Sequence, residues 1–380
     1  MTVTPLTPWF ADAAALARFR RRDLGRRPLV LPPRDDAWRA IAPGFAEARA
    51  MAASGLPFQV AAGRRYDRSA DPRRLGRALA AGATVYLPLV HQVLPRLARL
   101  MVALRLALLG PFREERSFLF LVEGRGRQGM GLHHDGDVES FWVQLEGRRT
   151  VTVGPPVAPG APADLPDRVA GSGGRGWWTA DLEPGTLFHL PPRTPHRVVC
   201  RARSLAVSLT WGPADPREAL AHVLGTVDAP ARASLATPRA LAAILRRMLR
   251  EAAGPAGRRL AAGRAWAAAA TEWDVVSGRV TAVPEASAER LWVQVPVLAG
   301  PVDRRRRRFP LWVAGGGEVW LPASVRRLAG RLALMPALPR ASLDADAVRA
   351  LLAHGVVGPR DLPLRIVPAA PAALDGWLFA

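Results

Sequence analysis

The chain has 380 residues, of which 49% are hydrophobic, and a formal net charge of +21 at pH 7. This length predicts two or three domains with room for a sizeable core. The single cysteine, Cys200, excludes an intrachain disulfide and a four-cysteine zinc site, and it fits the reducing cytoplasm, where we expect the protein to be located. Arginine accounts for all 53 basic residues against 32 acidic ones, so the composition leaves open an acidic partner such as RNA, DNA or a ribosomal surface.

No segment predicts a signal peptide or a membrane span. Residues 1–15 lack the charged start and the apolar core of a signal peptide. Arginines interrupt the most apolar stretch, residues 85–109, whereas a membrane-spanning helix needs about 20 unbroken apolar residues. We interpret this stretch as a strand followed by a packed amphipathic helix over residues 95–109.

A series of short apolar segments predicts a small barrel or sandwich of β-strands. Each segment has the length of a strand, and Gly and Pro turns separate them. We expect these strands at residues 83–89, 117–122, 140–144, 149–153, 186–190, 198–199 and 205–211.

From residue 212 onward the pattern changes to helices and mixed elements. Thr237 and Pro238 predict the start of a helix that Gly254 and Pro255 end. Its single apolar stripe consists of Leu241, Ile244, Leu245, Met248 and Leu249. We then expect an Ala-rich helix over residues 258–272, strands over 291–298 and 310–320, and helices over 322–334 and 343–354, the last capped by Ser342.

The strongest chemical signal is the H-x-D sequence formed by His133 and Asp135. Alternate residues of a strand point the same way, so both side chains can hold one metal ion. His196, which ends a P-P-x-x-P-H turn, supplies a third ligand. Two imidazoles and one carboxylate on one face leave positions open for a cosubstrate and oxygen, as in non-haem iron(II) oxygenases. H-x-D also occurs by chance, but no H-E-x-x-H or G-x-S-x-G motif supports a zinc protease or a serine hydrolase.

Two further stretches carry a resemblance to a known family. Residues 144–149 read Q-x-x-G-x-R, and residues 184–196 contain P-G and then P-P-x-x-P-H. Together with H-x-D they resemble the JmjC oxygenases of the cupin superfamily, in particular the bacterial ribosomal oxygenases, over about residues 28–211. The resemblance implies an α+β fold with a double-stranded β-helix (jelly-roll) barrel and N-terminal helices in residues 1–215, a helical dimerisation region in residues 216–285 and a winged-helix-like domain in residues 286–380.

The resemblance also implies iron(II) as cofactor, held by His133, Asp135 and His196, and 2-oxoglutarate as cosubstrate. The anchor of the cosubstrate would be Arg149, the basic residue two positions after the glycine of Q-x-x-G-x-R. One extra residue separates H-x-D from this strand, so a count from His133 points to Arg148 instead. We favour Arg149 because insertions belong in loops.

Other polar side chains near the motifs have alternative interpretations. Ser208 lies on a small polar strand face that suits a 2-oxoglutarate and water pocket, and we expect it to contact the cosubstrate. Asp137 and Glu139 either touch a basic substrate at the mouth of the barrel or are ordinary solvated acids. His134 is not expected to bind the metal, and His189 is a pocket or core histidine.

Aromatic and basic clusters are equally open to two interpretations. Trp142, Trp177 and Trp178 either line a substrate groove or pack in the core. The five arginines at residues 304–308 form a solvated loop or a contact for nucleic acid or the ribosome.

Three functions fit this sequence. The one we favour is a 2-oxoglutarate-dependent dioxygenase that hydroxylates a ribosomal protein, another basic protein or a peptide precursor, and works as a homodimer. The alternatives are a small-molecule cupin enzyme that does not use 2-oxoglutarate and a nucleic-acid-binding regulator with a sensing barrel. The Q-x-x-G-x-R strand favours the dioxygenase, because an ordinary cupin does not need it.

Overall fold

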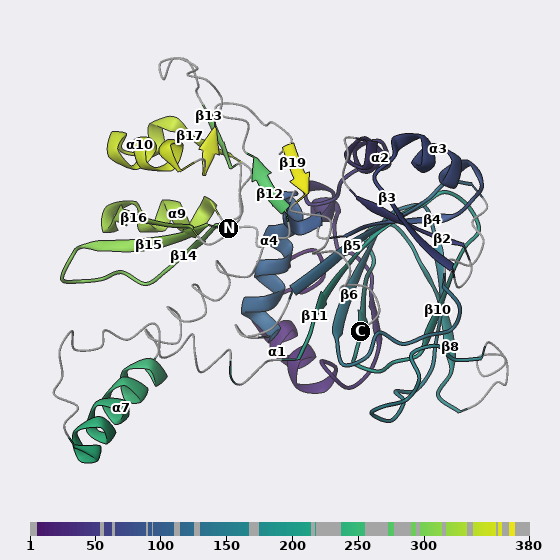
Figure 1. The fold of residues 1–380 in the computed structure, drawn as a ribbon, viewed down its shortest axis with the longest axis horizontal. Helices are drawn as coiled ribbons and strands as arrows, with labels where there is room; N and C mark the ends of the chain where they lie inside the picture. Colours follow the sequence, from purple (N-terminus) through teal and green to yellow (C-terminus); the bar gives the residue numbers. More distant parts are fainter. Residues whose placement is uncertain are drawn as a thin grey trace.

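The computed structural model of the chain describes residues 6–53, 57–62, 65–88, 90–92, 94–109, 115–124, 130–166, 175–213, 217, 237–254, 273–276, 290–293, 297–313, 317–332, 337–354, 356–358 and 365–368. Its largest part is a barrel of two antiparallel sheets (Figure 1). The eight-stranded sheet has the order β1 (Leu29–Leu31), β9 (Leu187–Leu190), β6 (Glu139–Glu146), β11 (Ser204–Trp211), β5 (Glu115–Val122), β4 (Thr84–Pro88), β2 (Phe58–Ala62) and β3 (Arg65–Ser69). The three-stranded sheet has the order β10 (His196–Cys200), β7 (Arg149–Val153) and β8 (Trp178–Leu182).

The two sheets enclose an apolar interior. Trp142 and Phe188 of the large sheet pack in one buried cluster with Val151 and Leu182 of the small sheet. In β7, alternate residues beginning with Arg149 are buried and those between them are partly exposed. This is the pattern of a strand with one face on a core and the other in water.

Helices cover the outer face of the large sheet. They are α1 (Ala13–Arg22), α2 (Phe45–Ala53), α3 (Pro72–Ala80) and α4 (Pro95–Leu104), which continues as a π-helical turn over Arg105–Leu109, with 3-10 turns at Asp36–Ala40 and Val90–Gln92. The rings of Phe19 in α1 and Phe141 in β6 lie 6.1 Å apart, in the main core cluster that also contains Trp211. Strand β6 lies between this layer and the barrel interior, so its residues are buried on both faces, and a continuous apolar run is its natural sequence.

The remaining elements form smaller units. They are helix α7 (Pro238–Ala253), the pair β12 (Trp273–Val276) and β19 (Arg365–Pro368), the sheet β17 (Ala337–Pro339), β13 (Arg290–Val293) and β18 (Val357–Gly358), the sheet β14 (Val297–Ala299), β15 (Arg308–Val313) and β16 (Gly317–Pro322), helices α9 (Arg326–Leu332) and α10 (Ala345–Ala353), and 3-10 turns at Ala323–Val325 and Arg340–Ser342. The two small sheets and their helices share a buried cluster of their own, which includes Phe309, Leu338 and Leu351.

The strand series expected between residues 83 and 211 is present, and the structure adds β8, which the sequence analysis missed. Helix α7 begins as expected, because the Ala240 amide donates to Thr237 Oγ1 over 3.2 Å. The helix expected at residues 258–272 lies outside the described residues. Strand β12 falls inside the region that was expected to be helical.

Two expectations for the C-terminal third are wrong in detail. The stretches 291–298 and 310–320 each contain parts of two strands, and β15 and β16 pair antiparallel from Val313 and Gly317 onward. The glycine-rich sequence between these two strands favours a hairpin over one long strand. Asp344, rather than Ser342, caps α10, because its Oδ1 accepts the Ala347 amide over 2.7 Å and a carboxylate directly before the first turn is a preferred cap.

No helix among the described residues combines the length and the apolar character that crossing a membrane requires.

Candidate metal centre

His133, Asp135 and His196 come together at one end of the barrel. His133 and Asp135 lie in the segment between β5 and β6, and His196 is the first residue of β10. A backbone bridge joins the two histidines, with N–H to O distances of 3.1 and 2.8 Å, so their ring centroids lie 4.2 Å apart. One ligand atom from each of the three residues lies within 4.8 Å of the other two.

Hydrogen bonds orient both imidazoles for metal binding. His133 Nδ1 lies 2.9 Å from the carbonyl oxygen of Gly131, and His196 Nδ1 lies 3.0 Å from that of Thr194. A carbonyl only accepts, so each Nδ1 carries the proton and each Nε2 keeps a free lone pair. His133 Nε2 faces Asp135 Oδ1 at 3.5 Å. This donor set fits a divalent cation that prefers nitrogen and oxygen ligands and leaves its other positions open.

The pKa values of His196 and Asp135 favour cation binding, whereas that of His133 favours its protonated form, from which a bound cation would have to displace a proton. Burial, together with the nearby His133 ring, lowers the pKa of His196 to about 4. Burial works to raise the pKa of Asp135, but the rings of His196 and His133 outweigh it and hold the value at about 2. At neutral pH His196 is therefore neutral and Asp135 ionised. Burial works to lower the pKa of His133, but its hydrogen bond and charge attraction to Asp135 raise it above the ordinary value.

His134 does not join the cluster, as expected. Its Nε2 lies 3.3 Å from the carbonyl oxygen of Ala161, and its Nδ1 accepts the Gly136 amide over 3.1 Å. Both ring nitrogens are therefore engaged with backbone, and this histidine has no free lone pair to offer a metal.

A buried guanidinium lies in the same barrel. Arg149 is only 6% exposed, and its Nε donates to Gln144 Oε1 over 2.8 Å. Its Cζ lies 5.6 Å from the ring centroid of Phe120 and 6.0 Å from that of Trp142. Cys200 and Tyr86 also lie near enough to influence its pKa. No carboxylate in the described part of the chain pairs with it, and burial lowers its pKa. A buried cation without a counter-charge is costly, so this position fits an anionic ligand.

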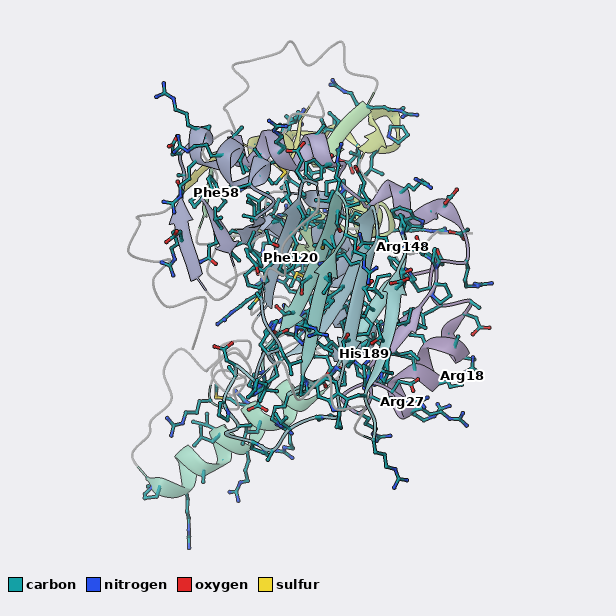
Figure 2. All side chains as sticks on the ribbon, turned by 90° about the vertical axis from the view of Figure 1, so that its right-hand side faces the viewer. Arg18, Arg27, Phe58, Phe120, Arg148 and His189 are labelled. Carbon is teal, nitrogen blue, oxygen red and sulfur yellow. The ribbon has the colours of Figure 1, made fainter. Side chains whose placement is uncertain are left out.

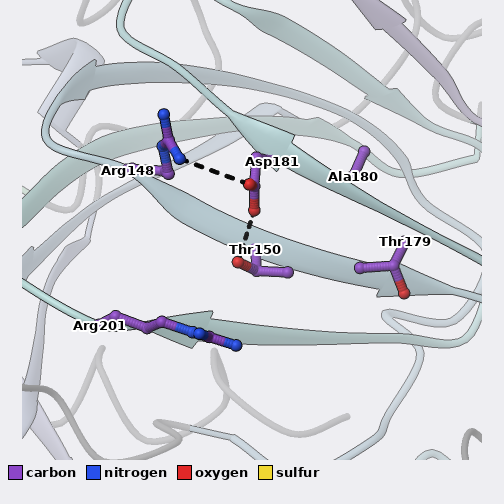
Figure 3. A pocket seen from close by; sticks show the side chains of 6 residues that line it. All are labelled: Arg148, Thr150, Thr179, Ala180, Asp181 and Arg201. Atoms are coloured by element: carbon purple, nitrogen blue, oxygen red, sulfur yellow. Dashed lines mark hydrogen bonds and ion pairs between the residues drawn. The ribbon is translucent and has the colours of Figure 1, made fainter.

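Arg148 points the other way. Its side chain is 61% exposed, pairs with Glu183, and lies 3.7 Å from Asp181. Arg148, Thr150, Thr179, Ala180, Asp181 and Arg201 line a hollow of about 390 Å³ on the outer face of the small sheet (Figure 3). Strand alternation puts this hollow on the opposite face from Arg149, so it is not part of the candidate site.

The structure explains why a glutamine and a glycine accompany the arginine in Q-x-x-G-x-R. Gln144 makes several hydrogen bonds to the turn that follows it. Its Nε2 donates to the carbonyls of Glu146 and Gly147, over 2.6 and 3.2 Å, and to Ser204 Oγ over 2.9 Å. Gly147 has a φ of +67°, and a Cβ there would lie 2.0 Å from the carbonyl oxygen of Arg203, so only glycine fits this turn. The sequence analysis had used the glutamine only as part of a motif.

The strand face that carries Ser208 points into the barrel. Ser208 is 3% exposed and lies opposite Trp142 of β6 and Phe118 of β5. Residues directly opposite in neighbouring strands share one face, and Trp142 belongs to the interior cluster. Ser208 therefore has the placement expected of a pocket residue.

Glu139 is buried, so both interpretations of it, a substrate contact and a solvated acid, are wrong, and His189 is the core histidine rather than a pocket residue. Glu139 is 3% exposed and does not reach the mouth of the barrel. It pairs with His189 Nε2 and accepts the Gly25 amide over 3.0 Å. His189 Nδ1 lies 3.1 Å from the carbonyl oxygen of Arg27 (Figure 2), and its ring centroid is 5.0 Å from that of Phe19. His189 is thus a core histidine on the outer face of the sheet.

Asp137 lies at the surface, and Trp142 and Trp178 pack inside the barrel. Asp137 is exposed and pairs with Arg193. Trp142 and Trp178 both pack on Phe188, at ring-centroid distances of 5.2 and 6.2 Å, which matches the interpretation that they pack in the core.

Comparisons with known proteins identify the fold of the barrel. Residues 112–218 match the sequence profile of the JmjC domain. Among curated proteins, none matches the chain significantly. Two structures of YcfD, a ribosomal oxygenase from Escherichia coli, one with cobalt and 2-oxoglutarate and one with cobalt and succinic acid, each match with 17% sequence identity and a TM-score of 0.56, over 90% of this chain and 97% of that chain. A third YcfD structure has 17% identity and a TM-score of 0.53, over 93% of this chain and 97% of that chain. At this identity the likeness establishes the fold, which is cupin-like with a large antiparallel sheet and helices.

We predict that His133→Ala, Asp135→Ala and His196→Ala each abolish tight binding of a divalent metal, whereas His134→Ala retains it. Each of the first three removes one of the clustered ligand atoms, so the loss should exceed the about 10–100-fold that losing an outer-shell partner costs. Equilibrium dialysis of the four variants against cobalt(II) measures it. Loss of metal in the His134 variant, with retention in the His133 variant, would mean that the ligand set is assigned wrongly.

Proposed function

We propose, from the match of residues 112–218 to the JmjC domain, that the protein is an iron(II)- and 2-oxoglutarate-dependent oxygenase that hydroxylates a side chain of a protein. The observation that carries the proposal is the buried guanidinium of Arg149, which shares the barrel with the candidate metal ligands and has no carboxylate partner among the described residues. A metal-binding barrel alone does not need such a cation. A dicarboxylate cosubstrate does, because one of its ends reaches the metal and the other remains to be paired.

His133, Asp135 and His196 would hold the iron(II). Their single ionised carboxylate and two imidazoles match the donor set of non-haem iron oxygenases. When bound, iron(II) and 2-oxoglutarate supply the oxidising chemistry, in which O₂ delivers one oxygen atom to a substrate C–H bond and 2-oxoglutarate leaves as succinate and carbon dioxide.

The protein's own part is to bind and orient the cosubstrate and to keep water out. Gln144 holds the Arg149 guanidinium through Nε, which leaves its terminal nitrogens for a bidentate contact with a carboxylate. Phe120 and Trp142 flank the guanidinium with apolar rings, and an ion pair is stronger where water is excluded. Ser208, on the same interior face as Trp142, is a second contact for the cosubstrate.

A ribosomal protein is the substrate we propose, and two observations support it. Structures that share this fold include those of a ribosomal oxygenase. The chain also has a net charge of +21, which attracts it to RNA-bearing particles. The arginines at residues 304–307 form an exposed turn, and the exposed Arg308 begins β15. Asp303 stabilises the turn, because its Oδ1 accepts the amides of Arg305 and Arg306 over 2.9 and 3.1 Å. We assign this turn to contact with ribosomal RNA.

We also propose that the chain is a homodimer assembled through the region of residues 216–285. Leu245 and Leu249 of α7 are 41% and 45% exposed, and with Val302 they are the exposed large hydrophobic side chains in the described part of the chain. Ile244 and Met248 share their stripe and are half-buried. An apolar stripe of this length on a surface helix calls for a partner surface.

Residues 286–380 are proposed to form a separate, winged-helix-like domain. The strands between residues 290 and 358 pair only with one another among the described residues, and they share a core with α9 and α10. A core and sheets of its own are what an independent domain requires.

The oxygenase function is tested at Arg149. Arg149→Ala should weaken 2-oxoglutarate binding by about 30–150-fold, equivalent to about 2–3 kcal/mol for a lost charge-assisted contact, while metal binding is retained. Arg148→Ala is the matched control and should behave as the wild type, because Arg148 is exposed on the outer face. Titration of iron-dependent succinate formation measures both variants. Wild-type protein that makes no succinate from 2-oxoglutarate, with or without ribosomes, would instead favour a cupin enzyme that does not use this cosubstrate.

The substrate proposal predicts that wild-type protein adds the mass of one oxygen atom to a ribosomal protein when incubated with ribosomes. The double variant Arg305→Ser, Arg306→Ser should modify intact ribosomes several-fold more slowly at low salt, yet modify the isolated protein at the wild-type rate, because only the RNA contact is lost. Arg20→Ser with Arg21→Ser removes the same charge from α1 and serves as the control. Mass spectrometry measures the modification rates. If both double variants slowed the reaction equally, the effect would come from the overall charge and not from a specific contact of the turn.

For the dimer, Ile244→Glu with Met248→Glu should give soluble monomers that still bind metal, because charges in an apolar contact cost several kcal/mol and the metal cluster lies in the barrel. Light scattering of the wild type and the double variant at micromolar concentration decides the matter. A monomeric wild type would rule the dimer out. A double variant that aggregates and no longer binds metal would show that the apolar stripe packs in the protein's own core.

A further inference from the structure

Strand β6 carries two buried polar atoms that have no partner among the described residues, Trp142 Nε1 and Ser140 Oγ. Trp142 is 6% exposed and Ser140 is 0% exposed. The two residues are separated by one position, so they share a strand face, and Trp142 belongs to the interior cluster. Both atoms therefore belong to the inside of the barrel.

Trp142 lies between the candidate metal ligands and the buried cation. Its ring packs edge-on against His196, with the centroids 5.0 Å apart at 72°. The Arg149 guanidinium lies 6.0 Å from the same ring, and Ser208 is its cross-strand partner on β11. The Trp142 ring thus lies next to both His196 and the Arg149 guanidinium, the two groups that a ligand reaching from the metal to Arg149 would join.

An unpaired indole N–H in this place is unfavourable for the protein alone. A buried tryptophan usually finds an acceptor for its N–H, and a buried donor without one carries its full desolvation penalty. Phenylalanine would keep an aromatic ring between His196 and Phe188 without that penalty, although the smaller ring gives up part of the packing. The tryptophan is explained if the acceptor belongs to a molecule that binds in the barrel.

We propose that Trp142 Nε1–H donates a hydrogen bond to an oxygen of the 2-oxo dicarboxylate that binds between the metal cluster and Arg149, so that Trp142 is a positioning and specificity residue for this cosubstrate. The proposal rests on the proposed function, since it takes 2-oxoglutarate as the ligand. It assigns to this tryptophan a polar role in addition to its packing against Phe188.

The test compares Trp142→Phe with the wild type in direct binding, without turnover. Manganese(II)-loaded protein is titrated with 2-oxoglutarate in the absence of oxygen. Loss of a hydrogen bond to an anionic ligand should raise the dissociation constant roughly 10–100-fold, whereas manganese(II) affinity stays unchanged. Trp178→Phe is the matched control, because Trp178 also packs on Phe188, and it should bind 2-oxoglutarate as the wild type does.

A purely structural role is distinguished by the stability of the ligand-free protein. Trp142→Phe removes an unsatisfied donor, which offsets the packing lost with the smaller ring. The urea-unfolding midpoint of the ligand-free variant should therefore stay close to that of the wild type, and the extra stabilisation by 2-oxoglutarate should be smaller. In the wild type loaded with zinc(II), one indole N–H resonance should move downfield when 2-oxoglutarate is added, a readout that needs no variant to fold.

The possible failures are distinct. Wild-type protein that does not bind 2-oxoglutarate overturns the proposed function and this inference together. Wild-type binding with unchanged affinity in Trp142→Phe, or with no shifted indole resonance, overturns the inference and leaves the function standing. A variant that loses manganese(II) or ligand-free stability in proportion to its lost 2-oxoglutarate affinity would reduce Trp142 to a packing residue.

Discussion

The amide of Gln144 holds together the parts on which the candidate site depends. It accepts from Arg149 Nε and donates to the turn carbonyls of Glu146 and Gly147 and to Ser204 of β11. A buried amide is tolerated only when its donors and its acceptor are satisfied, and here the bonds that satisfy it also close the hairpin and aim the guanidinium. Turn, strand and cation therefore form one unit, and a change in any of them leaves a buried polar group without its partner.

Strand alternation distributes the chemistry between the two faces of the large sheet. In β6, Ser140, Trp142 and Gln144 face the barrel interior, whereas Glu139 and Phe141 face the helices. The same rule places Arg149 inside and Arg148 outside. The neighbouring arginines Arg148 and Arg149 thus have different environments, and only Arg149 lies where a ligand in the barrel could reach it.

Individual site residues could be predicted from the sequence where a motif or a local spacing marks them, as with H-x-D, the P-P-x-x-P-H turn and the Q-x-x-G-x-R strand. The backbone bridge that brings His133 next to His196 joins distant parts of the chain, and their proximity was inferred from these motifs and the family resemblance. Features that depend on distant contacts were not predictable. The burial of Glu139 comes from His189 and the Gly25 amide, which lie far away in the chain, and the missing partner of Trp142 Nε1 is a property of the folded interior. Strand β8 was missed because its Thr179 and Asp181 face water and interrupt any apolar run.

The network around Glu139 has a consequence for how the chain reaches its native state. Gly25 donates to a side chain 114 residues later, and the carbonyl of Arg27 meets His189, 162 residues later. Residues 25–27 are synthesised before the barrel strands β6 and β9, so their polar groups can bind Glu139 and His189 only after most of the barrel has left the ribosome. Contacts over such sequence distances carry a large entropic cost of loop closure and slow folding. The rate of translation therefore limits how early this domain can complete its fold.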